Sequence, residues 1–253
     1  MVDFHRRIAS GNRLSPPGGT FTLSAAIEHL LWRTVTKQSV KDHDGGEFLD
    51  ALRTTHWPEA CAQDLASDGL RVRIIPQAYE LVWLRSTEAD LRSEIASAGF
   101  TTVTAKALTG AVSEMINNVW QHANSQAPGL LAYQLEPQRV HIAIADNGVG
   151  VLVSLRTNPQ HASLRTSMAA LKAAMRVGVS RYTEPAHGYG FDTMLRAVAD
   201  QWGAVRLRTG QAVLEFHAST DVRDTIASYG VDLPGLQITF SCGTTPPTAR
   251  ITL

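Results

Sequence analysis

Residues 141–150 read HIAIADNGVG, an apolar run that passes directly into an Asp-Asn-Gly-Val-Gly loop. Two strands, Leu130–Leu135 and Val140–Ala145, are predicted here, and the connection between them is short enough to make them an antiparallel pair. The second strand carries the Asp146 carboxylate into a loop whose glycines let a flat ligand approach the backbone closely. The alternative is an ordinary Asp-Asn-Gly turn, which is a common way to leave a strand.

A helix is predicted over Val103–Ala123, before this strand pair. On an ideal helix, which advances about 100° per residue, the polar residues fall on one face while Val112, Ile116 and Val119 point the other way. That face carries Glu114, Asn117, Asn118, Gln121 and His122. Taken alone, it could be a solvated helix surface.

A third element, residues 187–191, reads HGYGF and opens another predicted helix. Backbone amides at a helix N-terminus, together with the positive end of the helix dipole, suit a phosphate group. Gly-Tyr-Gly turns also have purely structural uses, so this element indicates a phosphate site only in combination with the other two motifs.

Composition indicates a globular protein. The 253 residues are 44% hydrophobic and 18% charged, with Lys+Arg 23 balancing Asp+Glu 23, so a nucleic-acid-binding surface is not indicated. No run approaches the roughly 20 apolar residues of a membrane span, and none resembles a secretory signal, so we expect a cytoplasmic protein that makes no membrane contact. Cys61 and Cys242 are expected to be buried, reduced thiols, and two cysteines cannot form a cysteine-only metal site.

The rest of the chain divides into a tail, residues 1–19, followed by helices and strands. Further helices are predicted at Ser24–Val40, Glu47–Leu65, Glu88–Ala98, Ser167–Val177 and from Phe191 to just before Gly203. Further strands are predicted at Leu70–Ile75, Tyr79–Leu84, Val205–Arg208, Ala212–His217, Leu236–Ser241 and Arg250–Leu253.

The order of these elements resembles the GHKL superfamily, which includes histidine kinases, gyrase-type topoisomerases and heat-shock chaperones. The resemblance covers residues from about Val103 to Ala218. It implies a two-layer α/β sandwich with a mixed, mostly antiparallel sheet and helices on one face, which we assign to residues 69–253. Residues 1–68 form an N-terminal region of unknown role. ATP and Mg²⁺ are the implied ligands.

Carried over residue by residue, the resemblance implies that Asp146 accepts a hydrogen bond from the exocyclic amine of adenine. Gly148 and Gly150 would permit close approach of the nucleotide. Val151–His187, which is long for a connection, would form a mobile lid.

At the phosphate end, Asn118 would ligate Mg²⁺ through its side-chain oxygen, a hard donor suited to that ion. Gly188 and Gly190 would shape the phosphate loop. Glu114 matches the family's acid, which orients or deprotonates the nucleophile. Further candidates on the same helix face are Asn117, Gln121 and His122.

Two departures from the family pattern concern the phosphates. Asp192 places an acidic side chain where many relatives have a second Gly-x-Gly step, and no Lys or Arg lies between Gly188 and Met194. Arg181 and Lys172 are possible substitutes. The family's Gly-Thr before the last strand has only Gly243-Thr244 here, displaced from the strand predicted at Arg250–Leu253, so no threonine is carried over.

Three functions remain open, because a fold does not fix a reaction. The first is a Mg²⁺-dependent ATPase whose hydrolysis or lid closure switches the interaction with a protein partner. The second is a stand-alone protein kinase of the anti-sigma serine kinase or histidine kinase type. The third is a nucleotide-responsive binding module without useful turnover. No pattern points to a particular partner, phosphoacceptor or oligomeric state.

Overall fold

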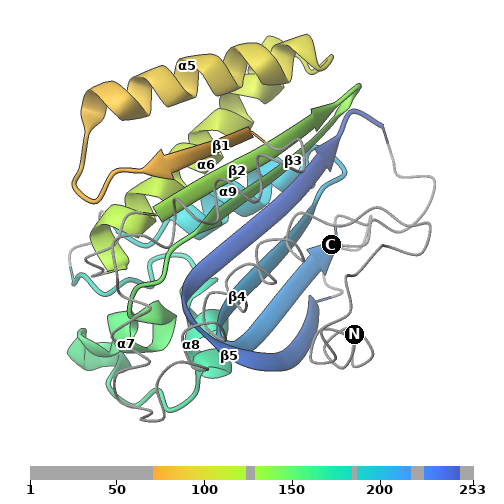
Figure 1. Ribbon diagram of the computed structural model, residues 1–253. Helices are drawn as coiled ribbons and strands as arrows, with labels where there is room; N and C mark the ends of the chain where they lie inside the picture. The colour runs from red at the N-terminus through yellow and green to blue at the C-terminus, as the bar shows by residue number, and fades with distance from the viewer. Residues whose placement is uncertain (1–70, 124–128, 184–186, 218–224, 246–253) are drawn as a thin grey trace, which may run out of the picture.

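A computed structural model describes residues 71–123, 129–183, 187–217 and 225–245, and Figure 1 shows how their elements are arranged. In chain order these are β1 (Arg71–Ile75), α5 (Leu81–Ser97), α6 (Thr102–His122), β2 (Gly129–Glu136), β3 (Arg139–Ala145), α7 (Gly150–Arg156), the 3₁₀ helix η1 (Pro159–His161), α8 (Ser167–Ala174), α9 (Gly190–Ala199), β4 (Ala204–His217) and β5 (Thr225–Gly243). The helices predicted before residue 70, the strand at Arg250–Leu253, Cys61 and the domain boundary near residue 69 lie outside these ranges.

The described strands form one sheet in the order β1-β2-β3-β5-β4, and every pair is antiparallel. The predicted hairpin of β2 and β3 is confirmed, with Glu136 opposite Arg139 across the turn. β5 lies between β3 and β4, so the last of the described strands is an interior strand, beside the strand that ends at Asp146.

The described helices cover one face of this sheet, which confirms the predicted two-layer α/β sandwich (Figure 1). Leu131, Ile144 and Ile238 stand side by side on neighbouring strands and belong to the hydrophobic core. Helix α5 lies over the edge strand β1, where Arg71 pairs with Glu94 at 3.2 Å and Arg73 with Asp90 at 2.6 Å. Such partly exposed ion pairs contribute little stability, so buried apolar area holds the layers together.

The strand predicted at Tyr79–Leu84 is wrong, because helix α5 begins at Leu81. The buried residues of this helix, Leu84, Thr87, Leu91 and Ile95, recur every three or four positions. A short window of aromatic and branched residues resembles a strand, but the helical period extends over a longer stretch and decides the structure.

β4 is a single strand where two were predicted, Val205–Arg208 and Ala212–His217. Its pairing with β5 shifts on both sides of Gly210, whose φ is 54°. Only glycine adopts this conformation readily, so the strand bends there and continues. β5 likewise extends well beyond the predicted Leu236–Ser241.

Candidate functional site

A cavity of about 400 Å³ lies between α6, the N-terminus of α9 and the segment that contains α7 and α8. It is lined by residues from each of the three motifs found in the sequence. Helix α6 contributes Glu114 and Asn118, the loop after β3 contributes Asp146, and the glycine-rich turn contributes Gly188 and Gly190. The fold therefore brings together side chains that lie far apart in the sequence.

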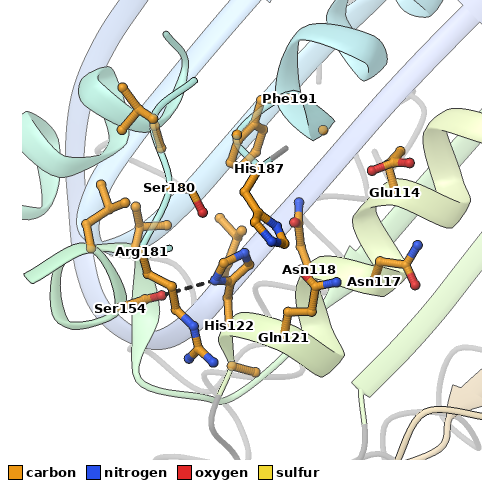
Figure 2. A pocket seen from close by; sticks show the side chains of 18 of the residues that line it. Glu114, Asn117, Asn118, Gln121, His122, Ser154, Ser180, Arg181, His187 and Phe191 are labelled. Atoms are coloured by element: carbon orange, nitrogen blue, oxygen red, sulfur yellow. Dashed lines mark hydrogen bonds between the residues drawn. The ribbon is translucent and has the colours of Figure 1, made fainter. Parts of the chain in front are cut away.

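The polar face of α6 turns toward this cavity, and Figure 2 shows its side chains in a row along the helix. The helix begins at the cap Thr101, whose hydroxyl accepts from the Thr104 N–H at 3.1 Å. Buried Val112, Ile116 and Val119 hold the opposite face against the core. Because the apolar face is fixed, the polar face is left to the cavity, and it presents Glu114, Asn117, Asn118, Gln121 and His122.

Asp146 is buried at the end of β3, with an exposed fraction of 6%. Its Oδ1 accepts a hydrogen bond from the Gly148 N–H at 2.8 Å, and its own N–H donates to the Leu236 carbonyl at 3.0 Å. Burial raises the pKa of Asp146 to about 6, and backbone hydrogen bonds from Gly148 and Leu236 oppose the shift. A buried carboxylate that faces a cavity is a strong candidate for binding a ligand.

The glycines after Asp146 are required by the protein's own packing. A Cβ on Gly148 would lie 2.0 Å from the Ala123 carbonyl oxygen, and one on Gly150, whose φ is 74°, would lie 2.9 Å from Thr209 Oγ1. The Val149 N–H also donates to the Ala123 carbonyl at 2.8 Å. Gly150 lines the cavity and Gly148 lies behind it, against the end of α6.

The glycine-rich turn before α9 approaches the polar face of α6. A Cβ on Gly190 would lie 3.5 Å from both Glu114 Oε2 and Asn118 Nδ2. Gly188, whose φ is 90°, accepts through its carbonyl from the Gly178 N–H at 3.0 Å. The N-terminus of α9 therefore faces Glu114 and Asn118 across a space that a side chain on residue 190 would partly fill.

The structure shows how Asp192 and the nearby cations, the two departures from the family pattern, lie relative to the cavity. The Asp192 carboxylate pairs with Arg196, one turn further along α9, at 2.9 Å and does not line the cavity. Of the two proposed substitute cations, Arg181 lines the cavity and Lys172 does not. The acidic residue is therefore partly neutralised by its own helix, and Arg181 supplies a positive charge at the site.

Sequence reasoning missed several lining residues on the segment between β3 and α9. The His122 and Tyr182 rings lie 5.5 Å apart, and the Tyr182 and His187 rings 4.5 Å apart. Burial, followed by the charges of Arg181 and His187, lowers the pKa of His122 to about 4. The Ser154 hydroxyl lies 3.5 Å from His122 Nδ1 (Figure 2). This segment was predicted as a lid with one helix, so nothing in its pattern distinguished Ser154, which lines the cavity, or Tyr182, which contacts the lining rings of His122 and His187.

The donors present fit a nucleotide better than a metal centre held by protein alone. Within the described ranges, no group of three or more His, Cys, Asp or Glu side chains is placed to hold a metal ion. The same part of the chain contains no helix with the length and apolar character needed to span a bilayer. A buried carboxylate and, in the same cavity, a helix N-terminus beside an amide side chain suit a base and its phosphates.

Comparison with known proteins agrees with this geometry. The sequence model of the histidine kinase-like ATPase domain matches residues 80–210, slightly more than half of the chain. The match contains Glu114, Asn118, Asp146, Gly188 and Gly190. No curated protein matches the chain.

Proposed function

Because the chain belongs to the histidine kinase-like ATPase domain family, we propose that it binds ATP and hydrolyses it with Mg²⁺ to switch its interaction with a partner protein. The observation that carries the proposal is the meeting of Glu114 and Asn118 with Gly190 at the N-terminus of α9. This arrangement supports a role for an acid and an amide at the terminal phosphates of a bound nucleotide.

Asp146 recognises the base in this proposal. An ionised carboxylate accepts a hydrogen bond from the amine of adenine but repels the carbonyl oxygen that guanine has at the same position. The burial of Asp146 supports the assignment, because a hydrogen bond to a charged group is stronger away from water. ATP should therefore bind more tightly than GTP.

The phosphates lie toward α9 and the face of α6 in the same proposal. The backbone of Gly188–Gly190 and the dipole of α9 favour an anion, and Arg181 adds a positive charge. Asn118 offers a hard oxygen to Mg²⁺, which when bound would offset the charge of the phosphate oxygens. Mg²⁺ commonly takes few protein ligands and completes its shell with phosphates and water, which fits one amide at this position.

Glu114 acts on the nucleophile. Its carboxylate orients a water molecule and accepts a proton as the water oxygen bonds to the γ-phosphorus. The bond from that phosphorus to the bridging oxygen breaks, and ADP leaves with the electron pair. A general base must lie within hydrogen-bond reach of its proton, which is consistent with a carboxylate 3.5 Å from the position of a Gly190 Cβ.

The same arrangement also serves a protein kinase of the anti-sigma serine kinase or histidine kinase type. The Glu114 side chain is exposed at the cavity rim, where a partner's hydroxyl or imidazole could take the place of water. A binding module would hold the nucleotide without either reaction. We expect a cytoplasmic location for the ATPase, the kinase and the binding module alike, and cell fractionation can check it.

One experiment separates the three versions. The full chain is incubated with γ-labelled ATP and Mg²⁺, with and without co-purifying proteins, and both released phosphate and labelled protein are measured. Phosphate release that Glu114→Gln abolishes supports the ATPase, and labelled protein supports the kinase. ATP binding with neither product leaves the binding module. Glu136→Gln, at the far end of the β2–β3 hairpin, is the matched control.

A further inference from the structure

Helix α7 begins directly after the Asp146 loop, and no side chain of its own caps it. Val149 occupies the cap position and makes no side-chain hydrogen bond to the helix. The first N–H groups of a helix have no partner inside the helix and need an acceptor from elsewhere. The Val151 N–H donates instead to the Thr209 hydroxyl, 3.1 Å away on β4 and 58 residues further along the chain.

The same hydroxyl also binds β5. Thr209 Oγ1 donates to the Gly235 carbonyl at 2.8 Å, and the side chain is buried with an exposed fraction of 2%. A hydroxyl has one proton to donate. Because Thr209 donates that proton to the Gly235 carbonyl, its oxygen can only accept from the Val151 N–H. The single group therefore joins the start of α7 to the strand that lies beside Asp146.

One partner of Thr209, Gly235, lies against Asp146, and the other, Val151, follows the Asp146 loop in the sequence. A Cβ on Gly235, whose φ is 71°, would lie 2.0 Å from the Asp146 carbonyl oxygen and 2.6 Å from Oδ1. The next residue, Leu236, accepts from the Asp146 N–H. On the other side, Gly150 leaves no room for a Cβ beside Thr209 Oγ1. One buried hydroxyl thus joins the part of β5 that lies against Asp146 to the start of α7, the helix that follows the Asp146 loop.

We propose that Thr209 is a positioning residue for base recognition, which holds the Asp146 loop in the geometry that selects adenine. The inference rests on the proposed function, since it gives Asp146 the role of reading the base. Thr209 does not line the cavity, so it acts through Asp146 and makes no contact with the nucleotide.

The test uses Thr209→Val, which keeps the shape of the side chain and removes the hydroxyl, and Thr209→Ser, which keeps the hydroxyl. Dissociation constants for ATP and GTP are measured by calorimetry on the full chain. Thr209→Val removes both hydrogen bonds of the hydroxyl; when the equivalent of one of them, a net value of about 0.5–1.5 kcal/mol, is lost at the base, affinity falls by about 2–10-fold. We expect a loss of this size for ATP with Thr209→Val, a smaller preference for ATP over GTP, and recovery of both in Thr209→Ser.

Two further measurements make the result specific. Exchange of the Val151 amide hydrogen should accelerate in Thr209→Val, with or without nucleotide, because the amide loses its acceptor. The control is Thr87→Val on α5, a buried threonine whose hydroxyl has no hydrogen-bond partner among the described residues. It should leave both the ATP to GTP ratio and Val151 exchange unchanged. If Thr209→Val does not fold, Thr209→Ala carries the same expectations.

The outcomes separate this inference from the proposed function. A wild type that binds ATP and GTP equally overturns base reading by Asp146, and the role of Thr209 falls with it. A wild type that prefers ATP, together with a Thr209→Val variant that keeps the full preference, overturns only the positioning role. A Thr209→Ser variant as impaired as Thr209→Val does the same, because the hydroxyl would then not be the group that matters.

Discussion

ATP affinity should depend on pH through Asp146. Burial raises the pKa of this carboxyl to about 6, so it is almost fully ionised at pH 7.5 and only about one-tenth ionised at pH 5. Only the ionised form offers the strong charged acceptor to the adenine amine. Affinity should therefore be highest above pH 6 and fall by about tenfold between pH 7.5 and pH 5.

Calorimetry across this pH range on the wild type and Asp146→Asn measures the effect directly. The amide should weaken ATP binding at pH 7.5 by roughly 1–3 kcal/mol, the scale of a hydrogen bond to a charged group. Because Asn does not titrate, any pH dependence left in the variant belongs to other groups, such as the phosphates of the nucleotide. The quantity to follow is the ATP affinity of the wild type divided by that of Asp146→Asn, and this ratio should decrease as pH falls.

The thermal stability of Asp146→Asn serves as the internal control for its ATP affinity. The pKa of Asp146 in the folded protein lies above its ordinary value of 3.8, so protonation favours the folded state. That contribution is fully present below pH 3.8 and is lost as pH rises through about 6. Asp146→Asn should therefore not lower the melting temperature at pH 7.5, even though it weakens ATP binding. A ratio of affinities that stays constant from pH 7.5 to pH 5 would refute the assignment of Asp146 to the base.

Three more results are expected. Glu114→Ala should keep most of the ATP affinity yet lower phosphoryl transfer by about 10²–10⁴-fold in a single-turnover assay; equal turnover in variant and wild type would end its catalytic role. Asn118→Ala should weaken ATP binding when Mg²⁺ is present and hardly change it in chelator, and an equal loss in both conditions would argue against a metal ligand. Saturating ATP analogue with Mg²⁺ should slow hydrogen exchange within Val151–His187, and unchanged exchange would contradict a lid that closes on nucleotide.

Much of the fold and most of the candidate site could be predicted because their signals are local. The α6 face is encoded by the spacing of Glu114, Asn118 and their apolar neighbours within one helix. The β2–β3 hairpin is encoded by two apolar runs with a short connection. Each motif is weak alone, but their order along the chain is specific enough to predict that Asp146 and Gly190 line one cavity.

The features that sequence reasoning missed depend on contacts between distant segments. Thr209 lies 58 residues from the Val151 N–H that it binds, and no local pattern distinguishes it from any other strand threonine. Sequence reasoning explained Gly148 by the close approach of a ligand. In the structure, a Cβ on Gly148 would instead clash with the Ala123 backbone. The strand predicted at Tyr79–Leu84 failed for a related reason, since a short window cannot show which periodicity continues beyond it.

Helix α6 contacts two parts of the proposed site, because Asn118 lines the cavity near Gly190 and the Ala123 carbonyl accepts from the Val149 N–H in the loop after Asp146. A helix rises about 1.5 Å per residue, so the span from Asn118 to Ala123 fixes these two points about 7–8 Å apart along its axis. A single inserted residue would rotate one end by about 100° relative to the other and separate the two halves of the site. The length of this short span is therefore a stricter requirement than most of its side chains, and related chains that bind the same ligand should vary its residues but not their number.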